Sequence, residues 1–478
     1  MEASMSKKFI GVVLFVALLS WPAAAQDAKT VISNASKAMG ADNLKTLEYS
    51  GKAWEGAFGQ AVNSSSAWPG FDQETYTRII DFEKPAWRID RTLAPVSPAR
   101  RGGGLPPALN QTVVVNPNTN WAQQLDLWMT PYGFLKAAAA NNATANSQTL
   151  GGKKYSVVTF MGQNNAKVNG YINEQNMVEK VETWIDNAVT GDTHLEAVYT
   201  GYKDFGGLKF PAKTVKKQGD YSIQDLTVTS VKPNAPANIQ PPQAAAGGGG
   251  PQPTTTSRKL GDGVYLILPG YASIAVDFKD YIVVLETGNS EQRASAIIAE
   301  AKKLIPNKPI KYVLNTHNHF DHASGLRTFM AEGVTILTHA SNKQYYEKIA
   351  TMPHTLNPDL LAKNPKKVLI EPIGDKKVLT DGNHVIELYR VQKSTHNDGL
   401  IMAYLPKEKV LLEADSWNPP GQPNGPAPLN NPIYNKNLMD NIQQLKLSVE
   451  TIIPVHYPAD SRVVTMSEFM QAIGRTSN

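Results

Sequence analysis

The sequence predicts an α+β protein of two domains. The N-terminal domain is expected to be mainly antiparallel β, and the C-terminal domain to alternate strands with helices. A length of 478 residues is long for one domain and suggests two or three. Residues 232–257 are rich in proline, alanine and glycine and hold almost no large apolar side chain, so they cannot pack into a core. We therefore interpret residues 232–257 as a linker between the two domains.

The composition is that of an ordinary soluble globular protein, because 41% hydrophobic residues supply a core and 19% charged residues supply a surface. The formal net charge of +5 is small for this length. No run of lysine or arginine could follow a phosphate backbone, so we expect no nucleic-acid partner. The chain contains no cysteine. It can therefore form no disulfide, and no thiolate is available as a nucleophile or a metal ligand.

The N-terminus has the pattern of a secretory signal peptide. Lys7 and Lys8 precede an apolar run, and an A-x-A cleavage site ends directly before Gln26. The apolar run, over residues 9–19, has 11 residues. A membrane-spanning helix needs about 20. We expect removal of residues 1–25, a periplasmic or secreted protein, and no stable membrane anchor after cleavage.

The N-terminal domain is expected over residues 26–231. It opens with a helix over 28–39 that ends at Gly40, and a second helix is expected over 132–140. Alternating polar and apolar residues predict a large antiparallel sheet after the first helix. The segment 202–211 resembles a hairpin of outer-membrane lipoprotein-carrier-like sheets. The expected strands are 75–82, 87–90, 112–115, 167–172, 178–186, 193–202, 212–217 and 222–230.

The spacing of histidine and acidic residues in the N-terminal domain does not predict a metal site. We interpret this domain as a scaffold or a wall that positions a substrate. The alternative is a sheet that binds an apolar ligand or a partner.

The C-terminal domain is expected over residues 258–478, where strands and helices alternate in a way that suggests two sheets covered by helices. Ser290 is expected to cap the first helix of this domain. The expected strands are 264–268, 273–276, 281–285, 311–316, 334–337, 367–371, 375–379, 384–390, 399–404, 409–413 and 451–455, and the expected helices are 290–304, 342–350, 438–447 and 466–475.

Four metal-binding side chains lie within six positions directly after a predicted buried strand. They are His317, His319, Asp321 and His322. Alternate positions of an extended segment point the same way, so the first two imidazoles can converge on one point. The other two side chains come at the start of a helix and can reach a second point. Three of the nine histidines of the chain share this window, and imidazole with carboxylate is a ligand set that zinc prefers.

The spacing H-x-H-x-D-H after a buried strand resembles the metallo-β-lactamase superfamily, and three later segments continue the resemblance in order. His396 resembles the next ligand of that family and precedes a pair of strands. Asp415 follows this pair, where many members have a carboxylate that bridges two metals. His456, at the end of a strand, resembles the last ligand. The resemblance covers residues 258–478 and implies an αββα sandwich for this domain.

The resemblance also implies a role for each of these residues. It implies two Zn²⁺ ions, with iron or manganese as alternatives, and a metal-bridging hydroxide that attacks a carbonyl. Asp321 would be the catalytic residue that orients this hydroxide and passes a proton to the leaving group. The implied ligands are His317, His319 and His396 for one metal, Asp321, His322 and His456 for the other, and Asp415 for both.

Further residues near these motifs are candidates for supporting roles. Tyr271 and Trp417 are candidates for contact with the substrate, and simple packing is the alternative for Trp417. Glu286 stands where the family usually has aspartate, and its longer side chain could hold a ligand histidine. Of the histidines outside the ligand set, His339 is interpreted as structural, and His354 and His384 as surface or loop residues.

These observations favour an exported metal-dependent hydrolase that acts on a small-molecule lactone, ester or amide. A bridging carboxylate such as Asp415 is usual in the lactonase-like and glyoxalase-II-like members of the family. One alternative is a zinc β-lactamase of the subclass without a cysteine ligand, whose members generally lack this carboxylate. Another is a non-catalytic metal-binding envelope protein. The natural substrate and the oligomeric state stay open.

Overall fold

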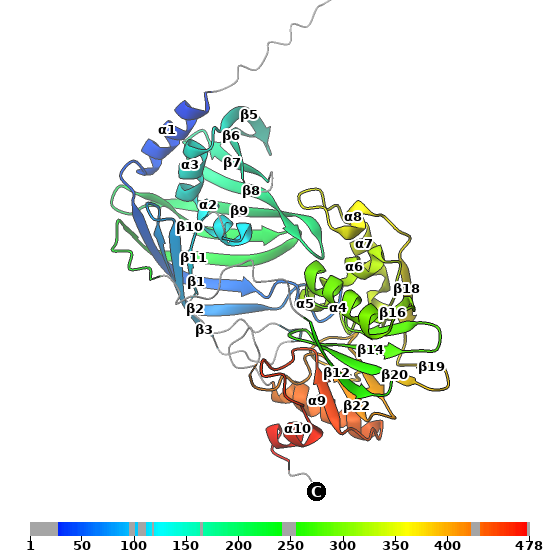
Figure 1. The fold of residues 1–478 in the computed structure, drawn as a ribbon. Helices are drawn as coiled ribbons and strands as arrows, with labels where there is room; N and C mark the ends of the chain where they lie inside the picture. Colours follow the sequence, from blue (N-terminus) through cyan, green and yellow to red (C-terminus); the bar gives the residue numbers. More distant parts are fainter. Residues whose placement is uncertain are drawn as a thin grey trace, which may run out of the picture.

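The computed structural model describes residues 27–94, 101–103, 111–116, 119–162, 166–240, 255–421 and 431–475. The expected signal peptide and most of the expected linker lie outside these ranges. The chain forms two domains that lie against each other (Figure 1). Among the described residues, none of the helices combines the length and the apolar character that a membrane span needs.

The N-terminal domain is built on one antiparallel sheet of eleven strands in the order β4-β3-β2-β1-β11-β10-β9-β8-β7-β6-β5. Every neighbouring pair is consecutive in the chain except β1 and β11, so two meanders are joined where these two strands pair. The sequence did not predict β1, β5 and β6; β5 is mostly polar and exposed, which hides the alternation of a strand. The strands are β1 (Thr46–Gly56), β2 (Gly70–Asp81), β3 (Ala86–Leu93), β4 (Gln111–Val114), β5 (Thr144–Leu150), β6 (Lys153–Met161), β7 (Lys167–Asn173), β8 (Val178–Asn187), β9 (Gly191–Asp204), β10 (Lys209–Gln218) and β11 (Tyr221–Pro233).

Three helices pack with this sheet around one core, namely α1 (Ala28–Met39), α2 (Trp121–Trp128) and α3 (Pro131–Ala140). The predicted bounds of α1 are confirmed. Asp27 caps its first turn by accepting a hydrogen bond from the backbone of Thr30, and Gly40 ends it in the left-handed region at φ 73°. Helix α2 was not predicted.

The C-terminal domain is a sandwich of two sheets with helices on both outer faces, as predicted. One sheet has the order β12-β13-β14-β15-β16-β17-β18 and the other β19-β20-β21-β22-β23. Alternate residues of one strand serve different layers: Leu266 lies in the core shared by the two sheets, and Ile267 lies in the core under α4, α6 and α7. Helices α9 and α10 cover the second sheet.

The elements of this domain lie close to their predicted positions. Helix α9 begins six residues earlier than expected, because Asn431 caps it and Pro432 fits its first turn. Helices α6 and α8 and strand β12 were not predicted. The strands are β12 (Thr256–Gly261), β13 (Val264–Leu268), β14 (Ser273–Asp277), β15 (Ile282–Leu285), β16 (Ile310–Leu314), β17 (Thr335–His339), β18 (Leu369–Ile373), β19 (Lys376–Thr380), β20 (Val385–Arg390), β21 (Ile401–Leu405), β22 (Val410–Glu413) and β23 (Thr451–Pro454), and the helices are α4 (Glu291–Leu304), α5 (Phe320–Ala323), α6 (Leu326–Ala331), η2 (Ala340–Asn342), α7 (Lys343–Ala350), α8 (Leu360–Lys363), α9 (Pro432–Gln444) and α10 (Met466–Ala472).

Parallel pairing brings the carboxyl ends of key strands to one edge of the sandwich. Strands β15 and β16 are parallel in the first sheet, and β22 and β23 are parallel in the second. Loops that follow the carboxyl ends of parallel strands are the usual place for a ligand site in open α/β sheets. Six of the seven predicted metal ligands follow these parallel strands, and His396 lies in the loop between the antiparallel strands β20 and β21.

The two domains also make direct contacts away from this edge. In the turn between β8 and β9, Val189 is fully buried in the core under α4, α6 and α7 of the other domain. Asp192 accepts hydrogen bonds from the backbone of Thr355 and Leu356 at 2.8 and 3.1 Å. His354, expected at the surface, is 4% exposed because this interface covers it. The linker is therefore not the sole connection between the domains.

Candidate metal centre

The seven predicted ligands come together where the strand ends of the two sheets meet. His317 and His319 lie in the loop after β16, and Asp321 and His322 lie in α5. The other three follow strands of the second sheet or connect them. His396 lies between β20 and β21, Asp415 two residues after the end of β22, and His456 two residues after the end of β23.

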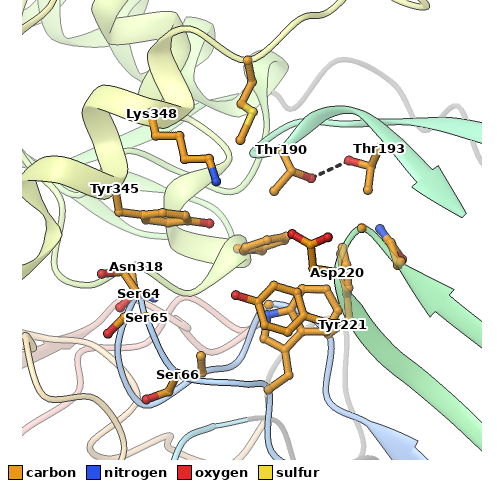
Figure 2. A pocket seen from close by; sticks show the side chains of 18 of the residues that line it. Ser64, Ser65, Ser66, Thr190, Thr193, Asp220, Tyr221, Asn318, Tyr345 and Lys348 are labelled. Atoms are coloured by element: carbon orange, nitrogen blue, oxygen red, sulfur yellow. Dashed lines mark hydrogen bonds between the residues drawn. The ribbon is translucent and has the colours of Figure 1, made fainter.

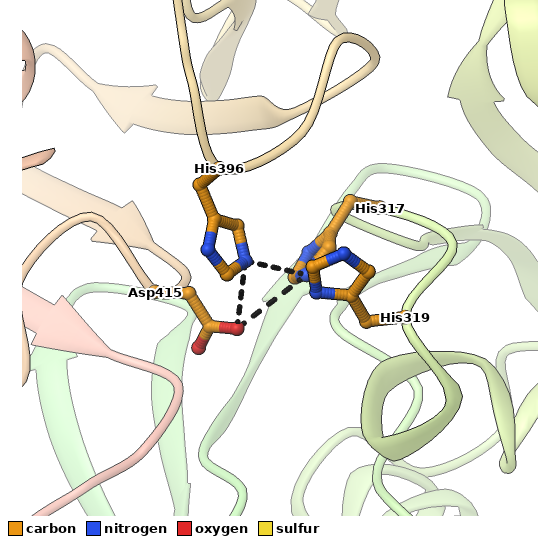
Figure 3. Close-up of side chains that lie close together, drawn as sticks. All are labelled: His317, His319, His396 and Asp415. Atoms are coloured by element: carbon orange, nitrogen blue, oxygen red, sulfur yellow. Dashed lines mark hydrogen bonds and ion pairs between the residues drawn. The ribbon is translucent and has the colours of Figure 1, made fainter. Parts of the chain in front are cut away.

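The first group consists of His317, His319, His396 and Asp415, whose ligand atoms all lie within 4.8 Å of one another. The Nε2 atom of His396 lies 3.0 Å from Asp415 Oδ2 and 3.3 Å from His317 Nε2. Figure 3 shows the four side chains pointing toward a common space. Three imidazoles with one carboxylate match a four-coordinate zinc site in number and kind.

The second group consists of Asp321, His322, Asp415 and His456, again with ligand atoms within 4.8 Å of one another. The Nε2 atom of His456 lies 2.8 Å from Asp415 Oδ1 and 3.4 Å from Asp321 Oδ2. The Nε2 atom of His322 lies 3.3 Å from Asp415 Oδ2. Asp415 belongs to both groups, in the position expected of a bridging ligand.

Unpartnered nitrogen atoms show that these residues fit metal ions. Buried polar atoms are nearly always hydrogen-bonded. Nevertheless, the buried Nδ1 of His319 has no hydrogen bond, and the buried Nε2 of His322 has none of good geometry although carboxylate oxygens of Asp415 and Asp321 lie 3.3 and 3.5 Å away. The facing Nε2 atoms of His317 and His396 would also bring two lone pairs together unless a proton or a cation lies between them. Cations between the groups would satisfy all four nitrogen atoms.

The charges of the centre favour cations as well. Burial would raise the pKa of Asp415, but His322 and His456 beside it lower this pKa well below its usual range. Burial opposes a charge on His456, but Asp415 raises the pKa of that imidazole to about 9. Burial and the neighbouring His322 lower the pKa of His317 to about 4. At neutral pH Asp415 is therefore ionised and His317 is neutral, which are the forms that bind metal, whereas His456 holds a proton that a cation would displace.

Glu286 lies behind the ligands and holds His322 in place. It is fully buried, and its Oε2 lies 3.3 Å from His322 Nδ1. The same oxygen accepts a hydrogen bond of 2.6 Å from Thr316, and the other accepts one of 2.8 Å from the backbone of Thr287. Such a contact leaves Nε2 of His322 as the ligand atom. The longer carboxylate at this position thus makes the contact that the sequence suggested.

Two residues at the centre adopt backbone angles that are rare for side chains other than glycine. The φ angle is 77° at Glu286 and 59° at Asp415. Such strain costs of order 1–3 kcal/mol and persists where the surrounding contacts require it. Here it directs both carboxylates toward the histidines.

The two candidates for substrate contact have different surroundings. Tyr271 lies at the centre, where its hydroxyl donates a hydrogen bond of 3.0 Å to Asp321 Oδ2 and its ring contacts His456. Trp417 is 1% exposed and packs against Phe469 in the core under α10. Packing, the alternative for Trp417, is the role that the structure shows, because the chain after Asp415 turns its side chain inward.

The other histidines lie away from the ligands. His339 accepts a hydrogen bond from the backbone of Ser341 and caps the turn η2, a structural role as expected. His384 lies in the turn between β19 and β20.

The N-terminal sheet contains a cluster that the sequence did not predict. Glu182, His194 and Glu196 lie within 4.8 Å of one another because β8 and β9 pair in this register. Spacing along the chain cannot reveal such a cross-strand group. Lys180 already lies 2.8 Å from Glu182 and supplies a positive charge there.

Residues of the N-terminal domain also reach the metal centre. Gln60 donates a hydrogen bond to Asp321, and the carbonyl of Ala61 lies 2.9 Å from the Nε2 of His319. These partners are about 260 residues apart in the chain, so no local motif predicts them. Tyr434 of α9, whose ring contacts His396, was not predicted either.

A cavity of about 760 Å³ lies between the domains, against the loop that contains His317 and His319. Its wall includes Asn318 and Phe320, which alternate with the ligands, and none of the seven ligands. Figure 2 shows Tyr345 and Lys348 of α7 on one side and Tyr221 on the other. The cavity is therefore separate from the metal centre.

Comparison with known proteins identifies the same region. The sequence model of the Metallo-beta-lactamase superfamily matches residues 269–456, a segment that contains all seven ligands. A linear primary-alkylsulfatase from a Pseudomonas species is 33% identical over 57 residues, which are 12% of this chain and 11% of that protein.

Several solved structures are similar to slightly less than half of the chain. A metallo-beta-lactamase from Pontibacter korlensis is 16% identical with a TM-score of 0.35, and the match covers 46% of this chain and 98% of that one. The metallo-beta-lactamase FIM-1 from Pseudomonas aeruginosa, in its mono-zinc form, is 18% identical with a TM-score of 0.35, covering 47% and 96%. Rubredoxin oxygen:oxidoreductase from Desulfovibrio gigas is 17% identical with a TM-score of 0.35, covering 46% and 60%.

The match of the sequence model, the sandwich fold and the order of the ligand segments agree. Residues 269–456 of this chain thus match the metallo-β-lactamase superfamily.

Proposed function

We propose that the C-terminal domain hydrolyses a small-molecule lactone, ester or amide with two zinc ions. The observation that carries this proposal is the pair of ligand groups that share Asp415. His317, His319 and His396 would bind one ion, and Asp321, His322 and His456 the other. Iron or manganese in the same ligands is the alternative, which analysis of the metal content decides.

The metals would supply a water of lowered pKa and a Lewis acid for the carbonyl of the substrate. Asp321 is the proposed catalytic residue among the side chains. Its Oδ1 is held by Gln60 and its Oδ2 by Tyr271, each at 3.0 Å. A carboxylate fixed on both sides can orient the attacking water, accept its proton and deliver that proton to the leaving group.

Hydrolysis of a sulfate ester is a second candidate. It is favoured by the short match with an alkylsulfatase. The same ligands and the same carboxylate would serve an attack on sulfur, so the substrate has to be determined by assay.

Removal of the metal should abolish hydrolysis. Dialysis against a chelator should remove the activity, and Zn²⁺ should restore it. Mg²⁺ should not restore it, because Mg²⁺ prefers oxygen ligands in octahedral geometry.

His317→Ala should lower kcat/KM by at least about 100-fold. The substitution removes a metal ligand itself, which is expected to cost more than the loss of a residue that only orients a ligand. His384→Ala serves as the matched control. Unchanged turnover in His317→Ala would contradict the proposed mechanism.

Loss of the carboxylate behind His322 should weaken metal binding. Glu286→Gln keeps the shape of the side chain but removes the charge that faces His322 Nδ1. We expect metal affinity to fall about 10- to 100-fold, as is typical for residues that orient a ligand. The affinity is measured by competition with a chromophoric chelator. Glu300→Gln, on α4 away from the centre, is the control, and equal affinities in the two variants would argue against this role.

The substrate class can be tested with one panel. It contains lactones, carboxylic esters, a chromogenic cephalosporin, a glutathione thioester and an alkyl sulfate, assayed with the zinc-loaded full chain. We expect turnover of lactones or esters. Rapid cephalosporin turnover without lactone turnover would favour the β-lactamase alternative, and turnover of the alkyl sulfate alone would favour the second candidate.

We also propose that the protein is exported to the periplasm or secreted. The support is the basic pair, the apolar run and the A-x-A site in residues 1–25. Mass spectrometry of the protein isolated from a bacterial host with a secretion system should find a chain that begins at Gln26. Recovery of the full-length chain from the cytoplasm would be evidence against export.

A further inference from the structure

A loop of the N-terminal domain reaches the first group of ligands. Residues 57–69 connect β1 to β2, and the carbonyl of Ala61 lies 2.9 Å from His319 Nε2. A carbonyl can only accept, so Nε2 of His319 carries the proton and donates. This leaves Nδ1 of His319 without a proton, and Nδ1 is the atom of this ring that has no partner in the centre. The N-terminal domain thus selects the tautomer that binds metal.

The same loop contacts the proposed catalytic carboxylate of the second group. Gln60 Nε2 donates a hydrogen bond of 3.0 Å to Asp321 Oδ1. Tyr271, from the C-terminal domain, donates one of the same length to Oδ2. Each domain therefore fixes one oxygen of Asp321.

A second segment of the N-terminal domain covers the first group. A methyl group on Gly103 would clash with the side-chain oxygen of Gln60 and would lie 2.7 Å from His396 Cε1 and 2.8 Å from His319 Cε1. The backbone of Gly103 also donates a hydrogen bond of 3.0 Å to the carbonyl of Gln60, and the carbonyl of Gly102 accepts one of 2.6 Å from Tyr434. Glycine is needed here because the backbone packs directly on the imidazole rings.

Several contacts hold the loop against the C-terminal domain. The backbone of Asp398 donates a hydrogen bond of 2.7 Å to the carbonyl of Val62, and Asn63 donates one of 2.9 Å to the carboxylate of Asp398. Phe58 packs edge to face on Phe320, with ring centroids 4.9 Å apart. The positions of Gln60 and Ala61 are therefore set by contacts on both sides.

The exposed fractions of the ligands agree with this cover. The side chains of His317 and His396 in the first group are 0% and 5% exposed. In the second group, the side chains of Asp321 and His456 are 28% and 20% exposed. Solvent therefore reaches the centre at Asp321 and His456, while the N-terminal domain closes the side of His319 and His396.

We propose that the N-terminal domain is part of the active site. Gln60 is a positioning residue for Asp321, the carbonyl of Ala61 sets the tautomer of His319, and Gly103 closes the first group so that the substrate approaches at the second. The part that concerns turnover rests on the proposed hydrolase function. The part that concerns metal binding does not.

Gln60 can be tested with two variants in the full chain. Gln60→Met keeps the length of the side chain without its donor, and Gln60→Ala also removes its bulk. Both variants should lower the affinity for the second zinc ion and kcat by about 10- to 100-fold. KM should change little, because the contact between Gln60 and Asp321 is expected to stabilise the transition state and not to bind the substrate. Gln148→Met and Gln148→Ala, on the exposed edge strand β5, are matched controls expected to behave as wild type.

Gly103 is tested by its cover of the first group. Gly103→Ala should lower the affinity for the first zinc ion, while Gly374→Ala should not, because a methyl group at Gly374 meets nothing within 4 Å. Titration with zinc and a competing chelator measures both sites without any substrate. Circular dichroism and thermal melting show whether each variant folds.

The outcomes separate this inference from the proposed function. If folded Gln60→Met and Gly103→Ala bind zinc like wild type, the inference is overturned even when the wild type is an active hydrolase. If an effect appears in Gln60→Ala but not in Gln60→Met, Gln60 fills space and does not position Asp321. If wild type hydrolyses nothing in the panel, the proposed function fails, and the zinc titrations still decide the inference.

Discussion

Asp415 contacts four imidazoles, and the centre depends on this contact more than on any other. Its oxygens lie between 2.8 and 3.5 Å from nitrogen atoms of His317, His322, His396 and His456. A buried carboxylate is costly unless it is paired. Asp415 sits at a positive φ two residues after the end of β22, so the second sheet presents the charge and the first sheet presents two of the rings. The two sheets must meet at this edge for either group to form.

A consequence is that little of the centre is built by one sheet alone. Glu286 follows β15 and holds His322 from behind, while His456 comes from β23 on the other sheet. The N-terminal domain adds a third contribution, because Gln60 and Ala61 contact Asp321 and His319. Docking of the N-terminal domain thus reaches the candidate metal centre through a few hydrogen bonds. These hydrogen bonds connect the two domains at the candidate metal centre, far along the chain from residues 232–257.

Much of the fold was predictable because its signals are local. The helix α1 has its cap, its apolar spacing and its terminal glycine within 14 residues, from Asp27 to Gly40, and its bounds were predicted correctly. The polar edge strand β5 lacks alternation and was missed, as was β12 at the end of the linker. The predicted start of α9, at Leu438, is too late because Asn431 caps the helix and Pro432 fits its first turn. Strong local signals thus predict which helices and strands form. Weak or conflicting local signals lead to missed elements or to predicted ends that are displaced.

The sequence by itself predicted the candidate metal centre in two steps. Residue type and spacing predicted the cluster His317, His319, Asp321 and His322 after a locally readable strand, and the resemblance to the metallo-β-lactamase superfamily implied His396, Asp415 and His456. The tertiary structure alone decided what surrounds these ligands. It turned Trp417 into the core, placed Tyr271 on Asp321, brought Glu182 beside His194, and set Gln60 and Gly103 against the centre. Such contacts join residues of different strands or domains, and spacing along the chain carries no record of the strand register or the docking that creates them.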